Sequence, residues 1–113
     1  MAKYLMFVET YCTDPTREDE FNDWYNNLHA ADVLQNKGFT NLTRYELIPR
    51  VENNVQGKGK YLALWEIETD NLDAVIAEHK NTMRQKEKQG RFSPVAKSIS
   101  SGFYKQIFTF SQK

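Results

Sequence analysis

Cysteine is nearly absent from the sequence: Cys12 is the only one among 113 residues. A disulfide within the chain is therefore impossible, and a lone cysteine in a chain without an export signal is typical of a reducing compartment. Lys3 and Glu9 interrupt the apolar start of the chain, which argues against a secretory leader. No apolar run approaches the roughly 20 residues that cross a bilayer. We therefore expect a cytoplasmic protein with no membrane association.

The chain also lacks net charge, because 15 Lys and Arg residues balance 15 Asp and Glu residues. Proteins that bind nucleic acids need a surplus of Lys and Arg to neutralise phosphates, so we expect no nucleic-acid partner. The charges are nevertheless segregated. Residues 14–32 contain six acidic residues and one basic residue, whereas residues 80–97 contain six basic residues and one acidic residue. Two interpretations stay open: solvated helix faces, or complementary surfaces that act in self-association.

A chain of this length corresponds to a single domain over residues 1–113, which can bury about two-thirds of its unfolded surface without disulfides. Runs of aromatic and β-branched residues predict four strands, and capping residues followed by apolar stripes predict two helices. The expected strands are residues 3–11, 39–48, 61–68 and 102–110, with a helix after the first and after the third. This order predicts an α+β ferredoxin-like fold, a four-stranded antiparallel sheet with both helices on one face.

The first helix has both a start signal and an apolar stripe. Asp14 can cap this helix while Pro15 takes the first helical position. The stripe has helical spacing and consists of Phe21, Trp24, Tyr25 and Leu28. Asp32 would return to this stripe, so we expect the regular helix to end or turn before Asp32. The stripe of the second helix consists of Leu72, Val75, Ile76, His79 and Met83.

The first and third strands carry large apolar side chains on both faces. Leu5 and Phe7 alternate with Met6 in one strand, and Leu64 alternates with Trp65 in the other. A monomer would expose one of these sets as an apolar patch, which soluble monomers seldom do. We therefore expect a homodimer joined through the sheet faces.

The two histidines are candidates for proton transfer, because the ordinary pKa of imidazole lies near neutrality. On a helical wheel His29 flanks the apolar stripe one turn after Tyr25, where its ring can meet both the interior and water. His79 points at the core from the second helix. Each could be structural, His79 as a buried neutral ring and His29 as a helix-end residue. Two histidines from helices on one side of a sheet could also open onto the same space, which favours a functional site.

Other chemical motifs are missing. No combination of Cys and His has the spacing of a zinc site, and there is no glycine-rich phosphate loop. We therefore expect neither a metal ion nor a cofactor. Cys12 has no evident base beside it in the sequence, so we interpret it as structural.

Four short motifs follow one another between residues 18 and 47: Glu20-Phe-Asn-Asp-Trp-Tyr-Asn-Asn-Leu-His29, Asp32-Val-Leu34, Gly38-Phe39 and Arg44-Tyr45. In this order they resemble the EthD-like family of the dimeric α/β-barrel superfamily. The resemblance implies a ferredoxin-like subunit whose sheet meets that of a second copy to form a barrel. It also implies a small-molecule pocket between sheet and helices, with His29 as the functional candidate. Ala31 stands where such families usually have Pro.

Our first hypothesis is a cofactor-independent enzyme of the dehydratase, cyclase or isomerase type, acting on an aromatic or polyketide-like compound. His29 would be its catalytic acid or base. The other expected site residues would bind the substrate, namely Tyr25 and Tyr45 as hydrogen-bond donors, Trp65 and Phe7 as walls, and Arg44 and His79 as further contacts.

Two alternatives stay open. His79-Lys80-Asn81 with the later Ser93-Pro94 loosely resembles the haem-degrading monooxygenases of the same superfamily, although the first strand has no Asn and the second helix no Trp. The other alternative is a non-catalytic accessory dimer in which both histidines are structural. The sequence therefore leaves open whether the protein is an enzyme.

Overall fold

Strands and helices follow one another in the predicted order in the computed structural model, which describes residues 1–54 and 59–112. The strands are β1 (Ala2–Cys12), β2 (Phe39–Glu46), β3 (Tyr61–Thr69) and β4 (Ala96–Lys105). The first helical segment consists of the 3₁₀ turn η1 (Pro15–Arg17), the helix α1 (Glu18–Trp24), the π-helical turn η2 (Tyr25–His29) and the helix α2 (Ala30–Leu34). The second helical segment is α3 (Leu72–Lys88). No helix among these residues is long and apolar enough to cross a membrane.

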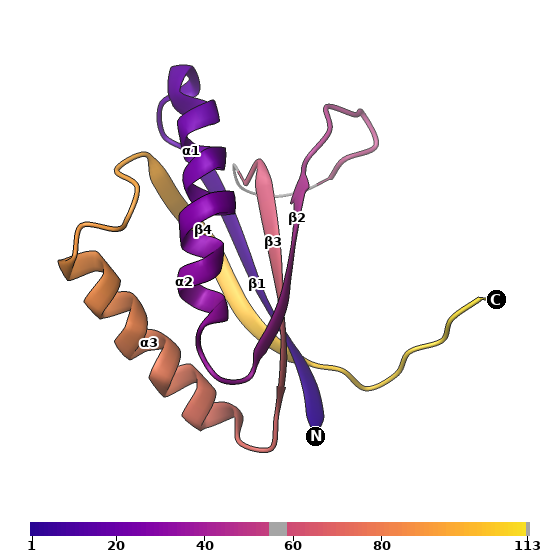
Figure 1. The fold of residues 1–113 in the computed structure, drawn as a ribbon. Coiled ribbons are helices and arrows are strands. Elements are labelled where there is room, and N and C mark those ends of the chain that lie inside the picture. The colour runs from indigo at the N-terminus through magenta and orange to yellow at the C-terminus, as the bar shows by residue number, and fades with distance from the viewer. Residues whose placement is uncertain (55–58, 113) are drawn as a thin grey trace.

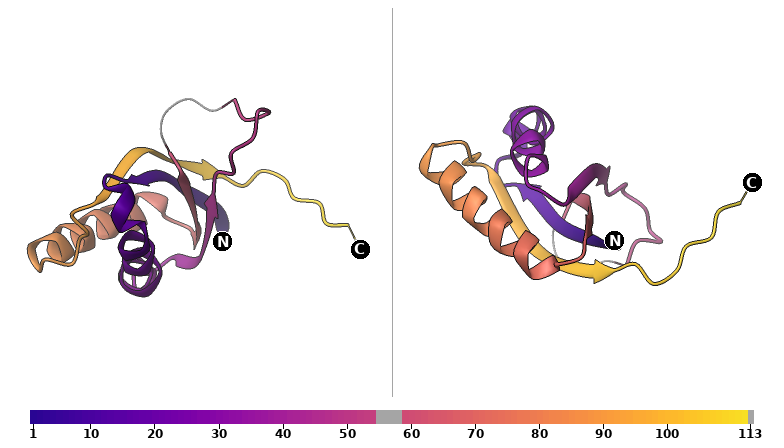
Figure 2. Two further views of the ribbon diagram at one scale, coloured as in Figure 1. Left: turned by 90° about the horizontal axis from the view of Figure 1, so that it is seen from above. Right: turned by 60° about the horizontal axis from the view of Figure 1, so that its bottom comes forward.

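The strands form one antiparallel sheet in the order β2-β3-β1-β4. Both helical segments lie on the same side of this sheet (Figure 1; Figure 2). The predicted α+β ferredoxin-like fold is therefore confirmed. The side that the helices cover is called the covered face below, and the other side the open face.

The register between β1 and β3 decides which apolar residues share a face. Met6 lies opposite Trp65, and both are buried on the covered face. Phe7 lies opposite Leu64, and both therefore project from the open face, because successive side chains of a strand alternate between faces. The sheet thus has apolar side chains on both faces, as the sequence predicted.

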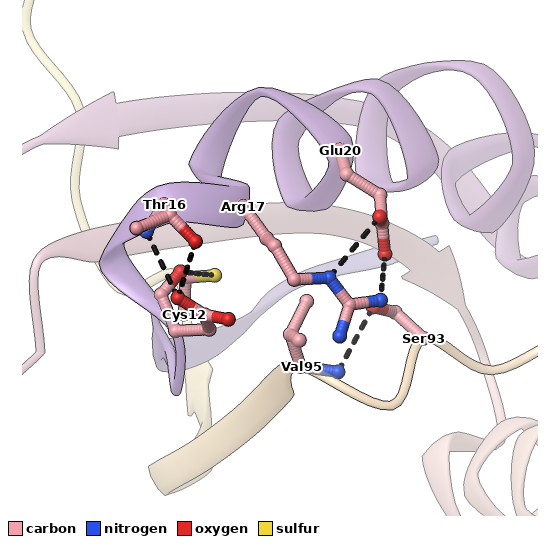
Figure 3. Close-up of polar contacts among 7 residues, drawn as sticks. Cys12, Thr16, Arg17, Glu20, Ser93 and Val95 are labelled. Atoms are coloured by element: carbon pink, nitrogen blue, oxygen red, sulfur yellow. Dashed lines mark hydrogen bonds and ion pairs between the residues drawn. The ribbon is translucent and has the colours of Figure 1, made fainter.

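Short polar contacts fix the turn from β1 into the first helical segment (Figure 3). The Asp14 side chain caps η1, accepting hydrogen bonds from the backbone N–H and the hydroxyl of Thr16 at 3.0 and 2.7 Å. The Cys12 thiol donates to the backbone carbonyl of Asp14 at 3.1 Å, and Arg17 pairs with Glu20. The predicted cap at Asp14 is confirmed, and the Cys12 thiol lies in the same turn.

The regular α-helix ends at Trp24, before Asp32, as predicted, and the turn that follows it is π-helical. The backbone N–H of Ala30 donates to the carbonyl of Tyr25, five residues earlier, which closes a wider turn than an α-helix has. Each residue therefore advances less around the helix axis, so His29 turns back toward the apolar stripe. The helix then continues to Leu34.

The last strand was wrongly placed at residues 102–110. β4 begins at Ala96, opposite Cys12 of β1, and ends at Lys105. Its first half is rich in Ser, so pairing with β1 outweighs the weak strand propensity of these residues.

A C-terminal arm, residues 106–112, follows β4 and runs away from the sheet (Figure 1; Figure 2). Its first residue still donates a backbone hydrogen bond, from Gln106 to the Lys3 carbonyl at 2.8 Å. Beyond it, Ile107, Phe108 and Phe110 are 91%, 77% and 84% exposed. These aromatic residues suggested a strand in the sequence, but the described part of the chain offers them no partner strand.

Candidate functional site

A cavity of about 390 Å³ lies between the helices and the covered face of the sheet. Its size is within the range of small-molecule sites, and its walls come from β1, β3, β4, both helical segments and the turn before β4. Four of the predicted site residues line it: Tyr25, His29, Trp65 and His79. The two histidines therefore do open onto the same space.

Aromatic rings enclose the imidazole of His29. Trp24 stacks on it with ring centroids 4.7 Å apart and planes inclined by 16°. Tyr25, Trp65 and Phe92 meet it edge to face at centroid distances of 4.9, 5.9 and 6.0 Å. This arrangement fixes the plane of the imidazole and keeps much of the surrounding water away from it.

The aromatic surroundings keep His29 neutral. Burial lowers its pKa from 6.5 to about 4, and the nearby His79 adds to this effect, which Asp32 partly opposes. At neutral pH the ring therefore carries one proton and has one nitrogen free to accept another. A neutral imidazole of this kind can act as a general base.

His79 provides a second neutral imidazole. Its ring contacts Phe39 at a centroid distance of 5.2 Å, and burial lowers its pKa. Nδ1 of His79 is buried and finds no hydrogen-bond partner in the part of the chain that the structure describes. Because Nδ1 has no acceptor within reach, we assign the single ring proton to Nε2. That nitrogen is then the one available to donate to a ligand.

Tyr25 and Arg44 form a support beside the cavity. Tyr25 is 2% exposed, and burial raises its pKa to about 12, so its hydroxyl stays protonated. The guanidinium carbon of Arg44 lies 4.3 Å from the centroid of the Tyr25 ring. Arg44 also donates to the side-chain oxygens of Asn26 and Asn22 at 2.8 and 2.9 Å. Arg44 does not line the cavity; it connects β2 to the π-helical turn that carries Tyr25 and His29.

Phe7 and Tyr45 were expected in the pocket, and the structure places both elsewhere. The Phe7 ring lies over Gly102 on the open face and contacts Tyr104 at a centroid distance of 5.6 Å. Tyr45 is 54% exposed and borders a shallow depression together with Leu62 of the open face. The reason is the strand register, which puts these side chains on the face opposite Trp65.

The structure adds residues that the sequence did not indicate. Arg91 makes two hydrogen bonds of 2.8 and 2.9 Å to the carboxylate of Asp32, and this pairing lowers the pKa of the buried Asp32. Trp24 donates from its indole nitrogen to the backbone carbonyl of Arg91 at 2.8 Å. These contacts hold the turn after α3 where Phe92 can meet His29. They also join the acidic and basic segments within one chain, 59 residues apart, a pairing that spacing along the sequence does not reveal.

Residues 4–105 match DUF4286, a family described as a domain of unknown function. The chain belongs to this family. No curated protein matches the chain significantly.

Solved structures share the fold over almost the whole chain. HapK from Hahella chejuensis is 13% identical, with a TM-score of 0.70 over 97% of this chain and 98% of that one. An EthD family protein from Bacillus halodurans C-125 is 14% identical, with a TM-score of 0.60 over 95% and 100% of the two chains. A dimeric ferredoxin-like protein from an uncultured marine organism is 14% identical, with a TM-score of 0.60 over 97% and 100%. The resemblance to EthD-like dimeric α/β-barrel proteins is thus confirmed at the level of the fold.

Proposed function

We propose that this protein is a homodimer that binds an aromatic or polyketide-like compound and performs acid/base chemistry on it without a cofactor. His29 is the catalytic base of this proposal. The observation that supports it most directly is the neutral imidazole of His29, held by aromatic rings at the wall of a cavity. The same rings offer flat apolar surfaces to a planar ligand.

The proposed chemistry needs only the two histidines. Neutral His29 takes a proton from the carbon beside a substrate carbonyl, and the bonding electrons move to the carbonyl oxygen. The Nε2–H of His79 donates a hydrogen bond to that oxygen. In a dehydration, the electrons return to form a carbon–carbon double bond as the neighbouring carbon–oxygen bond breaks. Protonated His29 then gives its proton to the leaving hydroxyl, so that one water is released and His29 is neutral again.

A simple β-hydroxy ketone tests this role of His29. Dehydration of 4-hydroxy-4-phenylbutan-2-one yields a conjugated enone, whose ultraviolet absorption reports turnover. We expect His29→Gln to lower kcat by at least about 100-fold, the usual contribution of general base catalysis, while the dissociation constant changes little. The matched control is Asn27→Ala, an exposed position of the same helical turn that does not line the cavity. Unchanged turnover by His29→Gln would overturn the assignment.

The same experiment separates the alternatives. A wild-type protein that binds the ketone and never converts it favours the accessory dimer and contradicts the catalytic proposal. Titration with hemin examines the haem alternative, because a Soret shift that disappears in His79→Ala would favour that interpretation instead.

The proposed dimer forms through the open face of the sheet. Leu5, Phe7 and Leu64 lie there with no helix over them, and the C-terminal arm, which follows the edge strand β4, exposes Phe108 and Phe110. Each aromatic side chain can bury about 150–250 Å². Two open faces and two arms therefore supply enough apolar area for a stable interface, which needs about 1,200–2,000 Å².

Leu64→Glu tests the dimer, because it places a charge at the centre of the open face. We expect wild-type protein to sediment as a dimer at micromolar concentration and Leu64→Glu as a monomer with an unchanged circular dichroism spectrum. Gln85→Glu, which adds the same charge on the exposed side of α3, should remain dimeric. A monomeric wild type, or a dimeric Leu64→Glu variant, would contradict the proposed interface.

A further inference from the structure

The cavity is mainly apolar in its depth, where Thr10 adds a buried hydroxyl group, and more polar at its mouth. Val33 and Trp65, at 0% and 1% exposure, form its deep wall. Ser98 and Ser101 line it from the edge strand β4, where both residues are exposed. A ligand that fits this cavity therefore has an apolar body and a polar end directed toward β4 and α3.

The charges of the lining residues have one sign. Among the residues that the structure describes, no Asp or Glu lines the cavity and Lys80 of α3 is the one Lys or Arg that does, while burial lowers the pKa of both lining histidines. Within residues 1–54 and 59–112, Lys80 makes no ion pair with an acidic side chain.

Its own helix does not neutralise Lys80 either. The positions three and four residues away on α3 are Ile76, Ala77, Met83 and Arg84. Arg84 lines a shallow depression that adjoins the mouth beside Lys80, together with Glu87 one turn further away. The mouth therefore has a positive bias.

We propose that the ligand of this cavity is an aromatic acid, whose ring system fills the deep aromatic part and whose carboxylate lies at the mouth beside Lys80, Ser98 and Ser101. This inference rests on the proposed function, since it names the substrate class of the same site. The carboxylate accepts hydrogen bonds from the two hydroxyl groups and from the ammonium group.

An acidic ligand also suits the proposed base. Burial disfavours the protonated form of His29, which weakens it as a base near neutral pH. A carboxylate bound in the same cavity favours the imidazolium form, because opposite charges attract. The ligand itself would thus bring His29 closer to the pH range in which a general base works best.

The test uses two probes of matched shape, 2-naphthoate and its neutral analogue 2-naphthamide. Their dissociation constants can be measured by quenching of the fluorescence of Trp24 and Trp65, which both line the cavity. We expect 2-naphthoate to bind about tenfold more tightly than the amide at low salt, with the preference shrinking as salt is added. Lys80→Met should reduce the preference to within about twofold while leaving the affinity for the amide unchanged.

The matched control is Lys88→Met, which removes an exposed lysine at the end of the same helix, outside the cavity lining. It should keep the full preference for the acid. Equal binding of the two probes, or a preference that survives in Lys80→Met, would overturn the inference and leave the proposed function in place. Failure of both probes to bind would overturn the aromatic pocket itself, and the proposed function with it.

Discussion

On the covered face of the sheet, Met6 and Trp65 are 5% and 1% exposed, and helices and a cavity lie above them. One position further along the same two strands, Phe7 and Leu64 project from the open face, with no helix above them. The residue types on the two faces are similar, and their surroundings differ. Apolar character therefore marks both a core and a prospective interface, and only the register and the placement of the helices distinguish them.

The two faces also differ in how they treat charge. Above the covered face His29 is held neutral and Asp32 is paired with Arg91, while the exposed Lys80 lies at the mouth of the cavity. On the open face charged residues such as Glu66 and Lys3 remain exposed around the apolar centre. A dry, electrostatically controlled site suits chemistry, whereas an apolar centre with a charged rim is typical of a protein interface.

The largest difference between the two faces should appear when one residue on each face is truncated and the loss of unfolding free energy is measured. Trp65→Ala should lower the free energy of unfolding by about 3–5 kcal/mol, because it leaves a cavity in a fully buried region. Leu64→Ala, on the adjacent position, should cost about 1 kcal/mol or less in the dissociated chain. Urea unfolding at submicromolar concentration measures both values. Equal losses would mean that the open face is also part of the core of a single chain.

The second expected difference is the pH dependence of the unfolding free energy, which we expect to arise from groups on the covered face. The pKa of His29 is about 4 in the folded chain and near 6.5 when unfolded, so the unfolded state binds more protons between these values. The contribution of neutral His29 to the unfolding free energy is therefore complete above about pH 6.5, and it is lost as the pH falls toward 4. Allowing for the partial exposure of the ring, the loss amounts to about 2 kcal/mol.

His29→Phe should flatten this dependence, because the variant has no group to titrate there. Unfolding by urea at pH 7 and pH 4.5 provides the comparison, and burial of His79 contributes in the same direction in both proteins. A slope that is unchanged in His29→Phe would place the responsible group elsewhere.

Removal of the C-terminal arm should affect only the open side of the molecule. A chain that ends at Lys105 lacks the exposed Ile107, Phe108 and Phe110, and we expect its dimer to dissociate about tenfold more readily, equivalent to roughly 1.4 kcal/mol. Sedimentation equilibrium gives the dissociation constant. Removal of residues 111–113 alone is the control and should change little. If the arm packs on its own chain in solution, truncation will instead lower the stability of the monomer.

The smallest effect is expected at Gly102 of β4. A Cβ atom there would lie 2.9 Å from Cε1 of Phe7, so Gly102→Ala must displace the end of this ring. Because the ring is on the open face and can turn, we expect the unfolding free energy of the dissociated chain to change by less than about 1 kcal/mol. A larger loss in thermal or urea unfolding would show that Phe7 is packed more rigidly than its position suggests.

The order of the elements could be predicted because each helix carries its own apolar stripe and each strand its own aromatic run. The covered position of His29 followed from the stripe that includes Tyr25. The predictions that were wrong concern residues whose position depends on contacts with residues far away in the sequence. Phe7 could not be assigned to a face without the register to β3, and the start of β4 at Ala96 depends on its pairing with β1.

The enclosure of His29 was the least predictable part of the site. Trp24 was recognisable as an apolar helix residue, but its stacking on His29 requires the π-helical turn between them. Phe92 comes from a turn that the Asp32–Arg91 ion pair holds in place. No local sequence pattern predicts contacts between residues this far apart in the chain.

The π-helical turn has a consequence for how such a site can arise. A turn closed between Tyr25 and Ala30 contains one residue more than a turn of α-helix, so deletion of one residue, such as Asn27, would restore the regular repeat. Because the π-helical turn carries five residues through about the rotation of four α-helical residues, α1 and α2 would face much as they do now. His29, however, would follow Tyr25 by three residues instead of four, which shifts its ring around the helix axis relative to Trp24 and Trp65. In evolutionary terms, the candidate base of this protein depends on the gain or loss of a single codon rather than on a substitution.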